Sequence, residues 1–191
     1  MGKKKVILIT DGDDIAAKAV QEAAINIGGR CISRTAGNPT EISGERIIEL
    51  INESNGDPIL VMVDDKGHSG LGQGEMAMKY IIESPEVEVL GVVAVASNTK
   101  NILGIKVDYS VDRNGELINK AVDKCGRKKK DKIVKGDTVD ILNYDRVPIV
   151  IGIGDPGKMD GYDSTEIGAP IVTRAIEEII KVNRENKKPD I

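Results

Sequence analysis

The sequence predicts an α/β protein of three layers, in which helices cover both faces of a doubly wound, mostly parallel sheet of the Rossmann-like kind. Short runs of apolar, often β-branched residues recur along the chain and alternate with segments of helical periodicity. These runs are apolar throughout rather than at every second residue, which is typical of strands buried on both faces. We expect a single domain over residues 1–191, with a polar tail from about residue 183.

Six segments have the composition of buried strands. They are Val6–Thr10, Arg30–Arg34, Ile59–Val63, Val87–Ala96, Lys106–Val111 and Val147–Ile153. Strands that alternate with helices imply right-handed crossovers and a parallel sheet. Between Asn114 and Arg146 the pattern is least regular, and there we expect one helix, a basic run and a short extra strand at Thr138–Leu142.

Four segments have helical periodicity and recognisable ends. The first, Asp14–Ile27, has acidic residues before it and a pair of glycines after it. The second is Glu41–Glu53, and the third, Gln73–Glu83, ends just before a proline. The fourth begins near Pro170, where a first-turn proline is tolerated, and carries an apolar face.

Composition excludes several classes of protein. The chain has four Tyr but no Phe or Trp, and its net charge is -4, so neither base stacking nor phosphate-backbone binding is favoured. We therefore expect no nucleic-acid partner. Cys31 and Cys125 have neither disulfide nor zinc spacing and are interpreted as reduced thiols in a cytosol-like compartment. We expect no signal peptide and no transmembrane segment, so that any membrane attachment is peripheral.

Acidic residues follow three of the expected strands. They are Asp11, Asp13, Asp64, Asp65 and Asp155. Because ligands of doubly wound sheets bind beyond the carboxyl ends of the strands, these carboxylates are candidate ligands for Ca²⁺ or Mg²⁺, bound weakly. The alternative is that each aspartate caps a helix or begins a turn.

A glycine-rich loop and the end of the fourth strand supply candidate ligand-binding residues. They are His68, Gly70, Gly72, Gly74, Ser97 and Asn98. The loop glycines allow backbone N–H groups to approach an anion at a helix N-terminus, but the loop matches neither a P-loop nor a dinucleotide fingerprint. His68 is a candidate general base or metal ligand, although a solvated loop histidine is the simpler interpretation. Residues 152–157 do have G-x-G-x-x-G spacing, but no helix opens directly after them.

One segment of this acidic protein is strongly basic. Arg127, Lys128, Lys129 and Lys130 are consecutive, and further lysines flank them. They are candidate contacts for an anionic membrane surface or an acidic partner, and the alternative is a solvated loop.

Four segments resemble a known family. They are ILITDGDDIAAKAVQEAAINIGGRCISRTAGNPT, ILVMVDDKGHSGLGQGE, LGVVAVASNT and IVIGIGDPGKMDGYDSTEIGAPIVTRAI, and together they are similar to the soluble stage V sporulation AE family of spore-forming Firmicutes. The resemblance implies a role in loading calcium dipicolinate into the spore and releasing it at germination. It also implies a place at the spore inner membrane, with the other stage V sporulation A proteins as partners. It carries no catalytic motif.

Three functions remain open at the level of sequence. The first is a non-enzymatic accessory protein that docks on channel subunits or on the membrane surface, alone or as an oligomer. The second is a Mg²⁺-dependent phosphoryl-transfer or hydrolytic enzyme that uses the acidic strand ends. The third is a domain that binds dipicolinate itself, whose two negative charges require N–H groups or basic side chains, or an intervening Ca²⁺.

Overall fold

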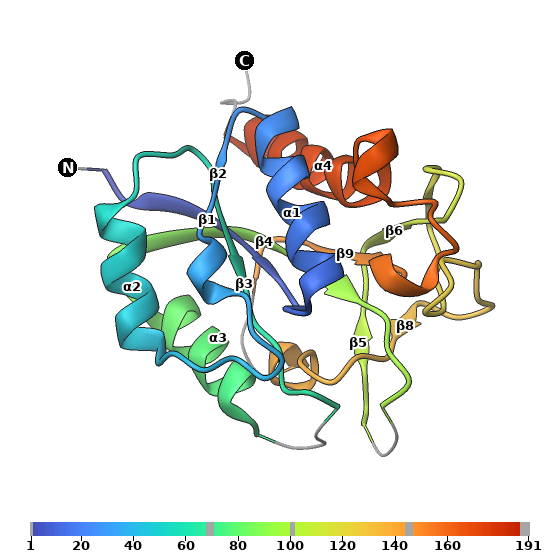
Figure 1. The fold of residues 1–191 in the computed structure, drawn as a ribbon, viewed down its shortest axis with the longest axis horizontal. Coiled ribbons are helices and arrows are strands. Elements are labelled where there is room, and N and C mark those ends of the chain that lie inside the picture. Colours follow the sequence, from blue (N-terminus) through green and yellow to red (C-terminus); the bar gives the residue numbers. More distant parts are fainter. Residues whose placement is uncertain (1, 68–70, 100–101, 144–146, 188–191) are drawn as a thin grey trace.

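The computed structural model describes residues 2–67, 71–99, 102–143 and 147–187, and it has the three predicted layers. Helices α1 (Asp14–Asn26) and α4 (Pro170–Asn186) lie together on one face of the central sheet. Helices α2 (Gly44–Glu53) and α3 (Gln73–Glu83) cover the other face (Figure 1). The predicted fold class is therefore confirmed. Helix α4 continues past Asn183, where we expected the polar tail to begin.

The central sheet has seven strands in the order β2-β3-β1-β4-β9-β6-β7. Their bounds are β1 Lys4–Ile9, β2 Arg30–Cys31, β3 Ile59–Met62, β4 Val87–Val95, β6 Tyr109–Val111, β7 Leu117–Ile118 and β9 Val150–Ile153. All neighbours are parallel except β6 and β7, which are antiparallel. From β1 the chain moves out to β2, whereas from β4 it moves to the opposite side of the sheet, so the topological switch point lies between β1 and β4.

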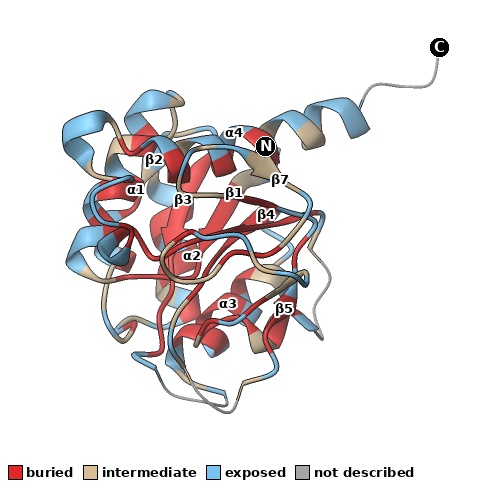
Figure 2. Ribbon diagram, turned by 90° about the vertical axis from the view of Figure 1, so that its right-hand side faces the viewer, coloured by how far each residue is buried: buried red, intermediate tan, exposed pale blue. Residues whose placement is uncertain are grey.

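Alternate residues of each central strand enter different cores. In β1, Val6 and Leu8 pack toward α2 and α3, while Ile7 and Ile9 pack toward α1 and α4. Figure 2 shows the central strands β1, β3 and β4 as buried over most of their length. This two-sided burial is the physical reason for the unbroken apolar runs in the sequence.

Two of the predicted strands differ in the structure. Strand β2 ends at Cys31, and a 3₁₀ turn at Ser33–Thr35 replaces its second half, because the Thr35 hydroxyl donates to the carbonyl of Ile32 and accepts from the N–H of Met62. The predicted strand Lys106–Val111 is also wrong as a single element. It is divided between β5 (Ile105–Lys106) and β6, which belong to different sheets.

The segment between β6 and β9 contains no α-helix among its described residues, contrary to our prediction. It contains β7, a hairpin closed by a bridge between Val122 and Lys128, and β8 (Ile133–Val134), which pairs with β5 in a second, two-stranded sheet. The predicted strand Thr138–Leu142 is likewise wrong. A 3₁₀ turn spans Asp140–Asn143, with the N–H of Leu142 donating to the carbonyl of Val139, and the Asp140 carboxylate accepts from the N–H groups of Leu103 and Gly104.

No helix within the described parts of the chain is long and apolar enough to cross a membrane.

Candidate functional site

A polar pocket of about 460 Å³ lies at the carboxyl edge of the sheet, across the switch point. It is lined by Thr10, Asp11, Asp13, Asn38, Asp64, Lys66, Gly67, Val95, Ser97, Asn98, Thr99, Asp137, Asp155 and Lys158. The predicted loops after β1, β3, β4 and β9 therefore meet, as the parallel sheet requires. We call this the acidic pocket.

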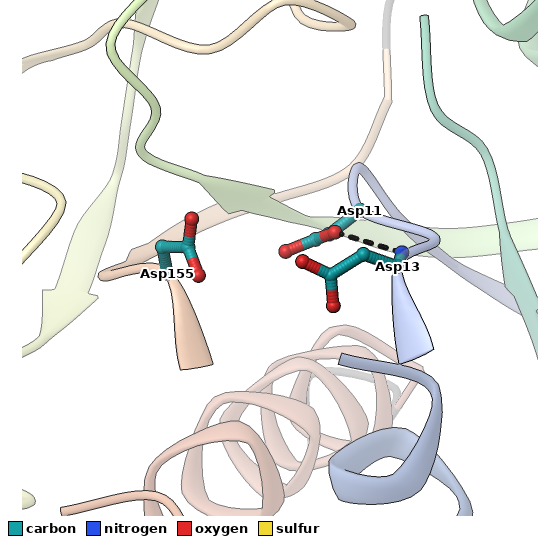
Figure 3. A group of neighbouring side chains, drawn as sticks. All are labelled: Asp11, Asp13 and Asp155. Atoms are coloured by element: carbon teal, nitrogen blue, oxygen red, sulfur yellow. Dashed lines mark hydrogen bonds between the residues drawn. The ribbon is translucent and has the colours of Figure 1, made fainter. Parts of the chain in front are cut away.

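Three of the predicted carboxylates converge inside it. One oxygen each from Asp11, Asp13 and Asp155 lies within 4.8 Å of the others. Figure 3 shows Asp11 and Asp13 side by side after β1, with Asp155 facing them from the end of β9. Asp11 and Asp155 are buried. Carboxylate oxygens at this spacing are the donor set that a hard divalent cation takes.

The same three aspartates also make local turn and cap contacts. Asp13 is the N-cap of α1, where its Oδ1 accepts from the N–H groups of Ile15 and Ala16 at 2.9 and 2.8 Å. The carboxylate of Asp11 accepts from the N–H of Asp13, and that of Asp155 accepts from the N–H of Gly157. Capping and clustering are therefore not exclusive, because a carboxylate has two oxygens and the cap uses one.

The acidic pocket shifts the pKa values of its charged residues. Burial raises the pKa of Asp11 to about 8, and the nearby charges of Asp13, Asp155 and Asp64 add to this. Lys158 supplies the opposite charge, since its ammonium contacts the Asp155 carboxylate. Burial lowers the pKa of Lys158, but the hydrogen bond and charge of Asp155 outweigh this, and the net pKa is raised. The ammonium of Lys158, an exposed residue at the rim of the pocket, thus partly neutralises the carboxylates.

Asp64 and Asp65 are neighbours in sequence but have different surroundings. Asp64 lines the pocket, where its carboxylate accepts from the N–H groups of Gly12 and Lys66 at 3.2 and 2.9 Å. Burial raises its pKa to about 6. Asp65 lies outside the pocket lining and accepts from the N–H groups of Gly74 and Glu75, at 2.6 and 3.0 Å, in the first turn of α3. Asp65 is a helix cap and does not join the cluster.

Gly72 and Gly74 are required because the chain at Asp64 and Asp65 lies so close to them. A Cβ at Gly72 would lie 2.2 Å from the Asp65 carboxylate, and one at Gly74 would lie 2.6 Å from the carbonyl of Asp64. The N–H groups that we expected to meet a bound anion already donate to Asp65. His68 and Gly70 lie outside the described residues.

The G-x-G-x-x-G spacing also has a packing reason. A Cβ at Gly152 would lie 2.5 Å from the Ser110 hydroxyl, and one at Gly154 would lie 2.5 Å from the backbone nitrogen of Gly126. Gly126 has a φ of 71° and belongs to the turn of the basic hairpin. Gly152 thus lets β9 lie close to β6, and Gly154 lets the end of β9 lie close to the hairpin.

The structure divides the basic run between two environments. Arg127 and Lys129 line a second hollow, of about 430 Å³, which adjoins the acidic pocket at Ser97 and Asn98. Lys128 and Lys130 are exposed and lie outside that lining. Arg127 is exposed as well, so the hollow takes in two of the four candidates and leaves the other two outside its lining.

Sequence reasoning missed several residues of the acidic pocket. Lys66 and Lys158 lie in the same loops as candidate aspartates, one to three positions after them. This closeness in the sequence could have identified them as members of the pocket. Asp137 comes from the segment between β8 and β9, whose path the sequence did not indicate, and its carboxylate accepts from the N–H of Gly67. Thr10 joins two strand ends, because its hydroxyl accepts from the N–H of Val95.

The fold and the pocket define an α/β protein with a polar pocket at the switch point of its sheet. The family described as Stage V sporulation protein AE1 matches residues 5–183, and the chain belongs to this family. Its role is therefore related to sporulation. Searches of curated proteins and of solved structures gave no match.

Proposed function

We propose that this chain is a non-catalytic accessory protein of the stage V sporulation A system, which takes up and releases calcium dipicolinate, and that it works at the surface of the spore inner membrane. Family membership supports the process. The convergence of Asp11, Asp13 and Asp155 carries the molecular part of the proposal, because these carboxylates suit a calcium ion.

The pocket fits a cation that brings ligands of its own. Ca²⁺ takes about six to eight oxygens at about 2.3 to 2.6 Å, and three aspartates leave several of those positions for water or for a bound ligand. Binding is weak, because Lys158 must give up its contact with Asp155 and Asp11 must lose a proton. A weak site suits a protein that responds to a passing calcium complex rather than storing it.

The proposed role in the uptake and release of calcium dipicolinate is tested in spores that lack this protein. The proposal expects a lower dipicolinate content in the mature spore or slower release at germination, restored by the wild-type gene. Complementation with Asp155→Asn should restore less than complementation with Asp64→Asn, because Asp64 is outside the converging triad. Normal dipicolinate content and normal release in the deletion strain would refute the accessory role.

Attachment to the membrane has its own test. Replacing Lys128, Lys129 and Lys130 by Gln should weaken sedimentation with vesicles that contain anionic lipid, and raised salt should do the same through screening. Sedimentation that changes in neither experiment would assign the attachment to protein partners, such as the other stage V sporulation A proteins.

One observation favours a second candidate, a Mg²⁺-dependent phosphoryl-transfer or hydrolytic enzyme. Asp11 is buried beside Asp13 and Asp155, and burial raises its pKa to about 8, which favours the protonated form that a general acid beside a metal needs. The accessory proposal expects no turnover of phosphoester substrates with Mg²⁺. Metal-dependent turnover that Asp11→Asn abolishes would replace the accessory role by this enzyme.

A further inference from the structure

A basic hollow lies on the other side of Ser97 and Asn98 from the acidic pocket. Its volume is about 430 Å³. It is lined by Ala96, Ser97, Asn98, Val122, Asp123, Lys124, Cys125, Arg127, Lys129 and Lys135. Four cationic side chains and one carboxylate thus enclose a concave surface in a protein whose net charge is -4.

The cations of this hollow are largely available. Among the described residues, Lys124, Arg127 and Lys135 form no ion pair, whereas Lys129 lies 3.3 Å from Asp131 and donates to the carbonyl of Ile133. The single lining carboxylate is already engaged. Asp123 accepts from the N–H groups of Cys125 and Arg127, both at 2.9 Å, and so closes the hairpin turn. The hollow therefore has an excess of positive charge.

Backbone contacts hold the main chain at two of the basic residues. The N–H of Asp155 donates to the carbonyl of Lys124 at 2.9 Å, and the N–H of Ser97 donates to the carbonyl of Lys135 at 2.8 Å. The close approach of Gly154 and Gly126 holds the hairpin against the end of β9. The main chain that carries these side chains is therefore already in place, so a bound ligand would have to order only the side chains.

We propose that the basic hollow binds a compact anion, the carboxylate or phosphate group of a small molecule, through Lys124, Arg127 and Lys135. Charge-assisted hydrogen bonds from ammonium and guanidinium groups to such oxygens are the strong ones in proteins. Ser97 and Asn98 form the wall shared with the acidic pocket, where the Ser97 hydroxyl is hydrogen-bonded to Thr99. This site is distinct from the acidic pocket, and the inference does not rest on the proposed role in sporulation.

The concave shape favours a small anion over a bilayer. A membrane surface engages protruding lysines, and Lys128 and Lys130 are exposed on the same hairpin but outside the hollow. The chain thus offers a matched pair of double variants. Lys124→Gln with Lys135→Gln removes two charges from the hollow, and Lys128→Gln with Lys130→Gln removes two charges from outside it.

The test is an NMR titration of the purified full chain with inorganic phosphate, repeated with malonate as a small dicarboxylate, at constant ionic strength set with sodium chloride. We expect saturable shifts of the backbone amides of Ser97 and of residues 123–129. The hollow variant should bind at least fivefold more weakly than the wild type, while the control variant should stay within twofold. Thermal unfolding midpoints of both variants verify that they are folded.

Three results would overturn the inference. The first is the absence of saturable shifts with both anions, and the second is an equal loss of affinity in both double variants, which would indicate net charge alone. The third comes from vesicles that contain anionic lipid. If vesicle binding depends on Lys124 and Lys135 while phosphate and malonate do not bind, the hollow is a lipid contact and the small-anion site is refuted.

Discussion

The acidic pocket and the basic hollow are neighbours at one edge of the sheet, yet their charged groups are held in different ways. The acidic pocket is built from loops that directly follow β1, β3 and β9, and several of its carboxylates also cap the turns that position them. The basic hollow is built from the hairpin and the strand β8 region, which tertiary contacts hold in place. Topology brings the converging carboxylates of the first together, whereas the second depends on close packing.

The largest expected effect comes from breaking that packing. Gly154→Ala places a Cβ 2.5 Å from the backbone nitrogen of Gly126, and neither atom can move without shifting a strand end or the hairpin. We expect a loss of unfolding free energy of about 3 kcal/mol, measured by urea denaturation.

Gly115→Ala is the matched control for this variant. Its φ is 81°, but no atom lies within 4 Å of the added Cβ, so only the backbone cost of about 1 kcal/mol applies. Equal losses of unfolding free energy in both variants would show that the contact between β9 and the hairpin contributes little to stability. The basic hollow would then not depend on close packing.

The next largest effect is a difference in stability between a variant of the helix cap, Asp65, and a variant of a clustered carboxylate, Asp11. Asp65→Ala leaves the N–H groups of Gly74 and Glu75 without their buried acceptor, so we expect a loss of about 2 kcal/mol. Asp11→Asn removes a buried charge from the cluster and should stabilise the protein at pH 8 when no divalent cation is added. A destabilising Asp11→Asn under those conditions would contradict the repulsion inferred for the acidic pocket.

The smallest effect is a pH dependence. Several folded-state pKa values are raised, to about 8 for Asp11, about 7 for Asp163 and about 6 for Asp64. For such groups the folded state binds protons more tightly, so stability is complete below about pH 4 and is lost as pH rises toward 8. We expect a decrease of about 1 kcal/mol in unfolding free energy between pH 5 and pH 8, because solvent in the pocket screens Asp11 and Asp64, and the N–H groups of Ile171 and Val172 stabilise the charged form of Asp163.

Asp11→Asn should flatten this pH profile in the upper part of the range, between pH 6 and pH 8. Urea midpoints at matched ionic strength measure both profiles. A wild-type stability that rises over this range would contradict the assignment of buried, mutually repelling carboxylates.

The two sites also show what the sequence could predict. Loops after parallel strands meet at one edge for topological reasons, so the meeting of Asp11, Asp13 and Asp155 follows from the alternation of strands and helices. The sequence could not show that Asp65 points away from the pocket and caps α3, because this depends on the side-chain conformation of Asp65 beside the helix N-terminus. Periodicity reveals buried strands but not the path of a segment with two-residue strands and 3₁₀ turns. The basic hollow was therefore hidden, although all four of its cations were visible in the sequence.

The central proposal is that the acidic pocket at the carboxyl edge of the sheet binds a divalent cation and that the Lys158 ammonium competes with this cation for Asp155. Calorimetric titration of the full chain with Ca²⁺ at pH 8 tests it most directly, with four variants compared to the wild type. We predict weak binding by the wild type, little or none by Asp11→Asn or Asp155→Asn, and unchanged binding by Asp65→Asn, which lies outside the cluster. Lys158→Gln should bind several-fold more tightly, because the competing ammonium is gone. Calcium binding that survives Asp155→Asn, or that Lys158→Gln weakens, would contradict the account.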